Sequence, residues 1–265
     1  MTPETLLAHA DCATSWPPEN LEQCRHDVTS AYRDALAVRG LRVARGEYPV
    51  GLNVEFTSRT IWQCYAVFAP IWGTVWNTTL ARCEGEATLD LTGVSQLRLE
   101  PEVAFCMSAT PPANAWLEEP FSCVDWLASS FKVVQSHFLG WKFNAAQAVA
   151  DGALHAHLLV GKPTPVSQIA GSGADLDKLL AQTHLKLYRG HELIDTGVGS
   201  NVLDGPLHAL LHFVHELATC PEAPSLQAGS IVTTGTWTDA WPVREGETWH
   251  YETNTPFASL QVAFR

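Results

Sequence analysis

Three features are scarce or absent in this sequence, and each absence excludes a class of protein. No stretch reaches about eighteen consecutive apolar residues, so a membrane-spanning helix is not predicted. Basic residues are few, with 16 Lys and Arg against 28 Asp and Glu, a formal net charge of −12 and no basic run. Nucleic acid and anionic membranes are therefore not the expected partners. The seven cysteines show no CxxC spacing, which argues against a disulfide framework or a thiolate zinc site.

The composition that remains is typical of a folded, soluble protein. A chain of 265 residues with 46% hydrophobic content can bury a sizeable core, as one large domain or as a small domain and a large one. The first residues lack the basic and apolar regions of a signal peptide, so the cytoplasm is the expected location. Ten tryptophans are present, and several of them in one cleft would make an apolar, aromatic pocket.

Hydrophobic periodicity places helices before strands. Apolar and small residues recur at helical spacing over residues 20–38, and Gly40 is placed to end that helix. Residues 1–50 are therefore expected to form an N-terminal helical region, and residues 51–265 a larger domain rich in short strands. This order favours an α+β fold over alternating βαβ units.

The elements expected after residue 50 rest on different signals. Helices are expected at residues 122–130 and 206–218, and a turn is expected at residues 70–73. Arg189-Gly190-His191 is a hairpin signal between strands at residues 185–188 and 193–196. Alternation and apolar runs predict further strands at residues 51–59, 87–91, 97–107, 131–138, 231–236, 249–253 and 260–264.

The strand predicted at residues 97–107 carries two carboxylates on one face. Glu100 and Glu102 are two positions apart, so their side chains point the same way. Like charges so close together are costly unless a cation lies between them. Three alternatives are open: the pair holds a divalent metal, it holds Lys132 from the strand predicted at residues 131–138, or it lies at a solvated sheet edge.

Four segments in a fixed order carry a resemblance to a known family. They are LEPEVAF at residues 99–105, TGVGSNVLDGPL at 196–207, LQAGSIVTTGT at 226–236, and Pro242-Val243 with Gly246. Together they resemble the 2-keto-4-pentenoate hydratase and 4-oxalocrotonate decarboxylase group of the fumarylacetoacetate hydrolase superfamily, from about residue 31 onward. The resemblance implies a mixed, rolled β-sheet core with an N-terminal helical region, a catalytic domain over residues 51–265, and a homo-oligomer.

The same resemblance implies an active site in which three carboxylates bind magnesium or manganese, and the metal chelates a 2-oxo acid. Glu100 and Glu102 match two of these carboxylates. The third belongs to a family segment of the form LEVVDSR, which becomes FKVVQSH at residues 131–137 of this sequence. Lys132 therefore stands at the position of the last ligand.

Other reactive groups of the family are also replaced. The active-site lysine of its Lys-x-Gly-x-Thr-Ser stretch falls on Asn53, and the glycine of that stretch falls on Glu55. An aspartate becomes Ile71 and a serine becomes Leu154. These changes favour a drier, more aromatic pocket, and hence an apolar or aromatic substrate larger than a small dicarboxylate.

Formal charge favours Lys132 over a metal. A magnesium ion with three carboxylates sums to +2 − 3 = −1, and Lys132 with Glu100 and Glu102 sums to +1 − 2 = −1. We therefore expect no metal cofactor; if Mg²⁺ or Mn²⁺ is bound, Glu100 and Glu102 are its expected ligands. An ammonium can stabilise a developing oxyanion, while glutamates or histidines move protons. The expected catalytic residues are Lys132, Glu100, Glu102, Glu55 and His137, and the expected substrate-binding residues are Asn53, Trp72, Leu154, His155, Thr236 and Trp237.

The sequence thus predicts a diverged lyase or hydrolase that acts through an enol or enolate on an apolar or aromatic oxo acid without a metal. A first alternative is a magnesium-dependent 2-oxo-dienoate hydratase, in which Asp125 replaces Lys132 as the matched ligand. A second is a non-catalytic binding subunit that keeps the fold and has lost the chemistry.

Overall fold

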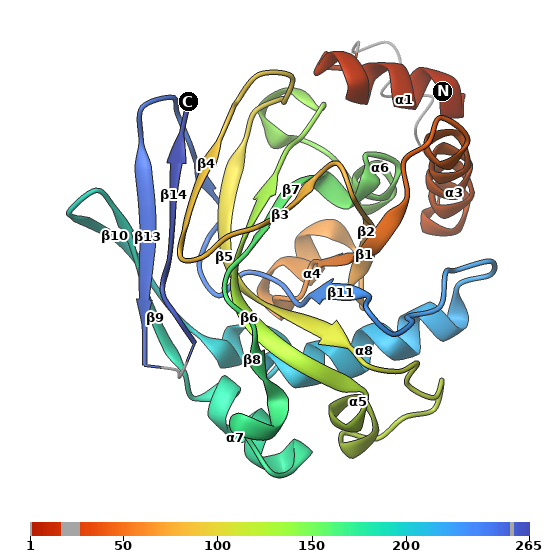
Figure 1. The fold of residues 1–265 in the computed structure, drawn as a ribbon. Helices are drawn as coiled ribbons and strands as arrows, with labels where there is room; N and C mark the ends of the chain where they lie inside the picture. Colours follow the sequence, from red (N-terminus) through yellow and green to blue (C-terminus); the bar gives the residue numbers. More distant parts are fainter. Residues whose placement is uncertain (1, 17–26, 255–256) are drawn as a thin grey trace.

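The computed structural model describes residues 2–16, 27–254 and 257–265, in an arrangement that mixes helices and sheets (Figure 1). The α-helices are α1 (Pro3–Cys12), α3 (Val28–Ala44), α4 (Arg59–Tyr65), α5 (Glu118–Ser122), α6 (Ala145–Ala150), α7 (Gly173–Ala181) and α8 (Pro206–Thr219). The short 3-10 helices are η1 (Leu139–Trp141), η2 (Gly152–Leu154), η3 (Val166–Gln168) and η4 (Gly199–Asn201). The strands are β1 (Pro49–Glu55), β2 (Ile71–Trp76), β3 (Leu80–Arg82), β4 (Glu86–Leu89), β5 (Arg98–Met107), β6 (Val124–Val134), β7 (His155–Val160), β8 (Thr164–Pro165), β9 (His184–Arg189), β10 (Glu192–Val198), β11 (Ile231–Thr233), β12 (Trp241–Pro242), β13 (Thr248–Thr253) and β14 (Leu260–Phe264).

Two mixed sheets make up the β part of the fold. The larger has nine strands in the order β2-β1-β11-β5-β6-β7-β3, with β12 paired to β5 and β8 paired to β6. Within it β1 is parallel to β11 and β3 to β7, whereas β5 is antiparallel to β6. The smaller sheet has five strands in the order β10-β9-β13-β14-β4 and lies on the opposite side of the molecule from α1 and α3 (Figure 1). The predicted α+β class with a mixed, curled sheet is confirmed.

Strands β5 and β6 lie at the centre of the larger sheet. Every residue of β5 after Arg98 is buried, as are the last eight positions of β6. A strand that is covered on both faces appears in the sequence as an apolar run. This is why the strand at residues 97–107 is predicted correctly. The antiparallel register pairs Glu100 with Lys132 across the two strands, so their side chains share one face of the sheet.

Two local predictions are wrong. Residues 122–130 are not one helix, because α5 ends at Ser122 and β6 then pairs with both β5 and β7. Residues 70–73 are not a turn, because Ile71 begins β2, which pairs with β1. In both segments pairing with distant strands overrides the local signal. Gly73 is required there because a Cβ would meet the Gly152 carbonyl oxygen at 2.2 Å.

The hairpin around Gly190 and the helix at residues 206–218 are confirmed by β9, β10 and α8. The N-terminal helix differs from its prediction at its end, since α3 continues through Gly40 to Ala44. Its predicted first part, residues 20–26, lies outside the described residues. On its buried side, Ala31 and Tyr32 join the same hydrophobic core as the sheet residues.

Substitution of Gly40 by alanine is expected to stabilise the protein. Gly40 lies inside α3, and a Cβ built there meets no atom within 4 Å. Alanine is favoured over glycine in a helix interior by about 0.5–1 kcal/mol, because glycine loses more backbone entropy on folding. Urea unfolding of Gly40→Ala should show a higher midpoint with an unchanged slope, and a lower midpoint would contradict a continuous helix through this position.

No helix within the described ranges combines the length and the apolar character needed to cross a lipid bilayer. The six cysteines that the structure describes are free thiols, at positions 12, 64, 83, 106, 123 and 220.

Candidate active site

The amino group of Lys132 lies between three carboxylates in the centre of the larger sheet. Its Nζ is 2.7 Å from Glu55 Oε1, 2.7 Å from Glu102 Oε1 and 3.1 Å from Glu100 Oε2. It also donates to the Val54 carbonyl oxygen at 3.3 Å. The Lys132 side chain has 0% exposure, so the cluster formed by Lys132, Glu55, Glu100 and Glu102 is a buried charge cluster.

Burial and mutual repulsion change the protonation of this charge cluster. Burial and then the charge of Glu100 raise the pKa of Glu55 well above its ordinary value, although Lys132 opposes them. Burial also raises the pKa of Glu102, against the attraction of Lys132. For Lys132 itself, burial lowers the pKa, but the three carboxylates outweigh it and the pKa is raised well above its ordinary value. The lysine is therefore charged, and burial with the neighbouring negative charges favours a proton on Glu55.

The charge cluster forms one wall of a cavity of about 670 Å³. Glu55 and Glu100 line the cavity, whereas Lys132 and Glu102 lie behind them. Gly235 belongs to the same wall, and its backbone N–H donates to Glu102 Oε2 at 2.8 Å. The groups that a ligand can touch at this wall are thus carboxyl groups, and the ammonium acts on the ligand through them.

Aromatic side chains form another wall of the cavity. The rings of Phe56 and Tyr65 stack with centroids 4.5 Å apart, and Tyr65 stacks on Phe143 at 5.7 Å. Trp141 continues this wall, with its ring centroid 5.9 Å from that of Phe143. All four residues line the cavity, so it offers an apolar, planar surface beside the carboxyl groups.

The structure divides the predicted site residues into three groups. Glu55, Glu100, Leu154, Thr236 and Trp237 line the cavity. Glu102, Lys132 and Asn53 are buried behind it, and Asn53 Nδ2 lies 3.5 Å from Glu55 Oε1. Trp72, His137 and His155 do not line the cavity, and all three line a separate pocket of about 90 Å³.

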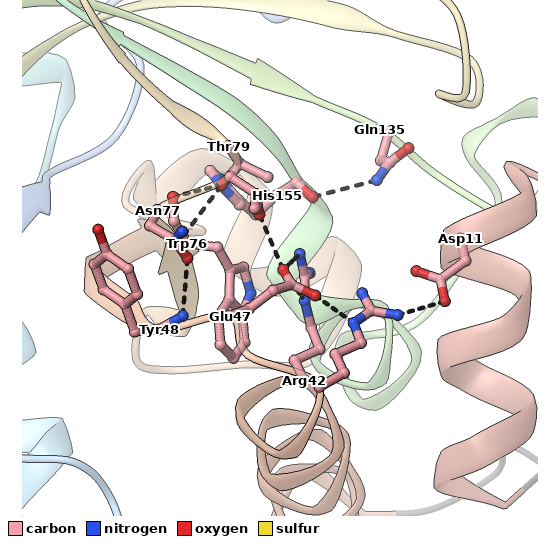
Figure 2. A network of polar contacts seen from close by, with 11 residues as sticks. Asp11, Arg42, Glu47, Tyr48, Trp76, Asn77, Thr79, Gln135 and His155 are labelled. Atoms are coloured by element: carbon pink, nitrogen blue, oxygen red, sulfur yellow. Dashed lines mark hydrogen bonds and ion pairs between the residues drawn. The ribbon is translucent and has the colours of Figure 1, made fainter.

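His137 and His155 are engaged on the side of the N-terminal helices. His137 Nδ1 is 2.5 Å from Asp151 Oδ1, and the His137 backbone N–H donates to Asp151 Oδ2 at 2.9 Å. His155 Nε2 is 2.8 Å from Thr79 Oγ1, and Gln135 Nε2 donates to the His155 carbonyl oxygen at 3.3 Å (Figure 2). Burial lowers the pKa of His155 well below its ordinary value. This geometry gives neither histidine a contact with a ligand in the larger cavity.

Sequence reasoning expected an aromatic pocket, but it did not identify the residues that form the aromatic wall, and it missed Arg98. Arg98 precedes Glu100 by two positions on β5, so strand alternation alone places it on the same face. It lines the cavity, as do Arg59 and Asp204 from its rim. The aromatic residues come from three separate segments, and only the folded sheet brings them together.

The residues present do not fit a divalent metal. Magnesium requires oxygen ligands at about 2.0–2.1 Å in octahedral geometry. Here the oxygens of Glu55, Glu100 and Glu102 converge on an ammonium that already donates to them, and a dication beside it would meet a positive charge. Asp125 does not supply an alternative ligand, because it is exposed and lies seven residues from Lys132 on β6, roughly 23 Å away.

Compared with the family pattern, the lysine and one glutamate of the site have exchanged strands. By the resemblance, β1 would carry a lysine at position 53 and β6 a glutamate at position 132. In this chain β1 carries Asn53 and Glu55, and β6 carries Lys132. The third carboxylate is therefore present, but it is Glu55 of β1, 2.7 Å from Lys132 Nζ.

The chain is similar in sequence to hydratases and decarboxylases. No family model matches it. It is 26% identical over 229 residues to a 4-oxalocrotonate decarboxylase from Pseudomonas sp, covering 84% of each chain, and 24% identical over 221 residues to 2-hydroxyhexa-2,4-dienoate hydratase from Comamonas testosteroni, covering 83% of this chain and 80% of that one. These relatives are lyases.

Solved structures show the same fold. The 4-oxalocrotonate decarboxylase from Pseudomonas putida G7, complexed with magnesium and adipate, matches with a TM-score of 0.87 and 21% identity, over 100% of this chain and 99% of that one. A putative fumarylacetoacetate isomerase/hydrolase from Oleispira antarctica matches with a TM-score of 0.57 and 13% identity, over 82% and 96%. With the ordered motifs, these matches confirm the resemblance of the chain to the fumarylacetoacetate hydrolase superfamily, and within it to the group of the 4-oxalocrotonate decarboxylases and 2-hydroxydienoate hydratases.

Proposed function

We propose that the protein is a lyase or hydrolase that acts through an enol or enolate on an apolar or aromatic oxo acid, without a metal. The observation that carries the proposal is the position of Lys132 Nζ, 2.7 to 3.1 Å from the oxygens of three glutamates. An ammonium at this position favours ionised carboxylates around it. It also fills the space between their oxygens that a divalent metal would need.

In the proposed reaction Glu55 and Glu100 act as an acid and a base on one substrate. Glu55 keeps its proton near neutral pH because burial and Glu100 raise its pKa. Glu100 removes a proton from the carbon next to the substrate carbonyl, and Glu55 donates its proton to the carbonyl oxygen, which yields the enol. Return of that proton to the far end of a conjugated enol gives an α,β-unsaturated ketone, and water then adds across its C=C bond in a hydratase reaction. In a decarboxylation the C–C bond to the carboxylate breaks instead, its electron pair enters the enol and CO₂ leaves.

Lys132 has a positioning role in this proposal, in place of the direct oxyanion contact expected from the sequence. It lies behind Glu55 and Glu100 and does not line the cavity. Its positive charge opposes the rise in the pKa of Glu55 and of Glu102 that burial causes. Two carboxyl groups whose environments separate their pKa values can serve as acid and base in the same site.

The aromatic wall of the cavity supports an apolar or aromatic substrate. Phe56, Tyr65, Trp141 and Phe143 present ring surfaces within the cavity. Such a surface binds a planar or apolar body better than a small dicarboxylate. The names of the relatives, a 4-oxalocrotonate decarboxylase and 2-hydroxydienoate hydratases, support a role in aromatic compound catabolism.

Removal of metal is expected to leave turnover unchanged. The purified protein would be dialysed against EDTA, its metal content measured, and its activity followed by ultraviolet absorbance with 4-oxalocrotonate, 2-hydroxydienoates and phenyl-substituted 2-oxo acids. Retained activity at less than stoichiometric metal is the expected result. Loss of activity with EDTA and its recovery with magnesium would instead support a magnesium-dependent hydratase, the cofactor with which the structural neighbour is complexed.

A non-catalytic binding subunit is the second alternative, and it is favoured by the loss of the family lysine at Asn53. It predicts that the acids bind but that none is converted. Binding followed by tryptophan fluorescence, in parallel with the turnover assay, separates the two functions, since Trp141 and Trp237 line the cavity.

A further inference from the structure

We infer that Arg98 binds the carboxylate of the substrate and makes the cavity specific for acids with one carboxylate and an apolar body. This inference rests on the proposed function of the cavity. Arg98 begins β5, is partly buried and lines the cavity. Its guanidinium carbon lies 4.3 Å from the centroid of the Trp141 ring, which fixes its plane against the aromatic wall.

Arg98 has its donors available. Within the described ranges it takes part in no ion pair, whereas Arg59, the other arginine of the cavity, pairs with Asp204 at 2.6 Å. Lys132 is likewise committed, since its amino group lies between three carboxylates. The guanidinium of Arg98 is therefore the cation of the cavity that can form a bidentate pair with a carboxylate.

The negative charge of the cavity makes such a cation necessary. Glu55, Glu100 and Glu102 outnumber Lys132, so the charge cluster is negative when all three are ionised and has no excess positive charge when Glu55 keeps its proton. An anionic substrate therefore gains no net attraction from this wall. In a metal site the dication would attract the acid; here Arg98 is placed to do so.

The spacing along β5 fits a carboxylate close to the reacting carbon. Arg98 and Glu100 lie on the same face of the strand, with backbone positions roughly 7 Å apart. A carboxylate on Arg98 therefore puts the next few carbons of the substrate beside Glu100 and Glu55. Arg98 also lies near Tyr65, because its positive charge opposes the rise in the pKa of Tyr65 that burial causes. Both side chains line the cavity.

A pair of ligands that differ only in charge tests this assignment. Binding of 3-phenylpropionate and 3-phenylpropionamide would be measured by calorimetry for the wild type, Arg98→Met and Arg82→Met. Arg82 is the matched control, because it stacks on Trp126 at 5.2 Å but is exposed and lies outside the cavity. Thermal unfolding would establish that each variant is folded, and Arg98→Lys, which keeps the charge but loses the planar fork, gives a second variant.

The wild type and Arg82→Met are expected to bind the acid about 10- to 100-fold more tightly than the amide. Arg98→Met should lose this preference and bind the amide as before, with Arg98→Lys in between. An acid preference that survives in Arg98→Met would overturn the assignment, as would its absence in the wild type or a failure of both ligands to bind at millimolar concentration. The binding assay needs no turnover, so it tests Arg98 separately from the reaction. If the protein binds the acid through Arg98 but converts no substrate, the assignment of Arg98 stands and the proposed reaction is refuted.

Discussion

Replacing Lys132 by methionine is expected to reduce the free energy of unfolding by about 3–5 kcal/mol at neutral pH. The substitution keeps most of the volume of the side chain but removes the positive charge that Glu55, Glu100 and Glu102 share. Three buried carboxyl groups then face one another without a cation, and they can reduce their repulsion only by binding protons.

The loss should depend on pH in a defined direction. Without Lys132 the carboxyl pKa values in the folded variant rise further above those of the unfolded chain. A carboxyl group of this kind contributes most below its unfolded pKa and loses that contribution as the pH rises through its folded pKa. Lys132→Met should therefore approach the stability of the wild type near pH 5 and fall away from it toward pH 8, as measured by urea unfolding.

The matched control is Lys186→Met on β9, where the lysine is exposed. It should change stability by no more than about 0.5 kcal/mol at either pH. The double variant Lys132→Met, Glu55→Gln should recover part of the lost stability at pH 8, because one of the repelling carboxylates is gone. Equal stability of Lys132→Met and the wild type at pH 8 would contradict an ion pair at this site.

The part of the site that could be predicted is the part that lies on one strand or one strand pair. Alternation along residues 97–107 places Glu100 and Glu102 on one face, and charge balance then points to Lys132. Alternation also places Arg98, two positions before Glu100, on this face. Glu55 lies on β1, however, and β11 separates β1 from β5. Its distance to Lys132 follows only from that strand order, which no local pattern in the sequence encodes.

The wrong predictions have the same origin. Ser122 to Ser130 has helix-compatible residues, but Leu127 and Ala128 are fully buried and pair with β5, and Leu127 also pairs with β8 on the other edge, so strand pairing decides the conformation. His137 lies in the strand predicted at residues 131–138, close to Lys132, and the sequence predicts it to act as an acid or base; β6 in fact ends at Val134. The turn after β6 carries it to Asp151 and to the pocket beneath the N-terminal helices, away from the larger cavity.

Glu55→Gln is expected to lower turnover by about 10²- to 10⁴-fold while the fold is retained, because it removes the proposed proton donor from the cavity wall. The raised pKa of Glu55 also predicts the shape of the pH profile for the wild type. Activity should hold while Glu55 is protonated and fall as the pH rises through its raised pKa, and the residual activity of the variant should lack this alkaline limb.

Stability should move in the opposite direction from activity in the same variant. The stabilising contribution of Glu55 is present in its protonated form and is lost as the pH rises through its folded pKa, since ionisation adds a charge beside Glu100 and Glu102. The amide introduced by Glu55→Gln cannot ionise, so this variant should gain stability relative to the wild type at alkaline pH. The exposed residue Glu86 on β4 offers the control Glu86→Gln, which should alter neither quantity. Turnover that survives in Glu55→Gln would show that another group is the acid. A variant less stable than the wild type at alkaline pH would show that Lys132 stabilises ionised Glu55 more than Glu100 and Glu102 repel it.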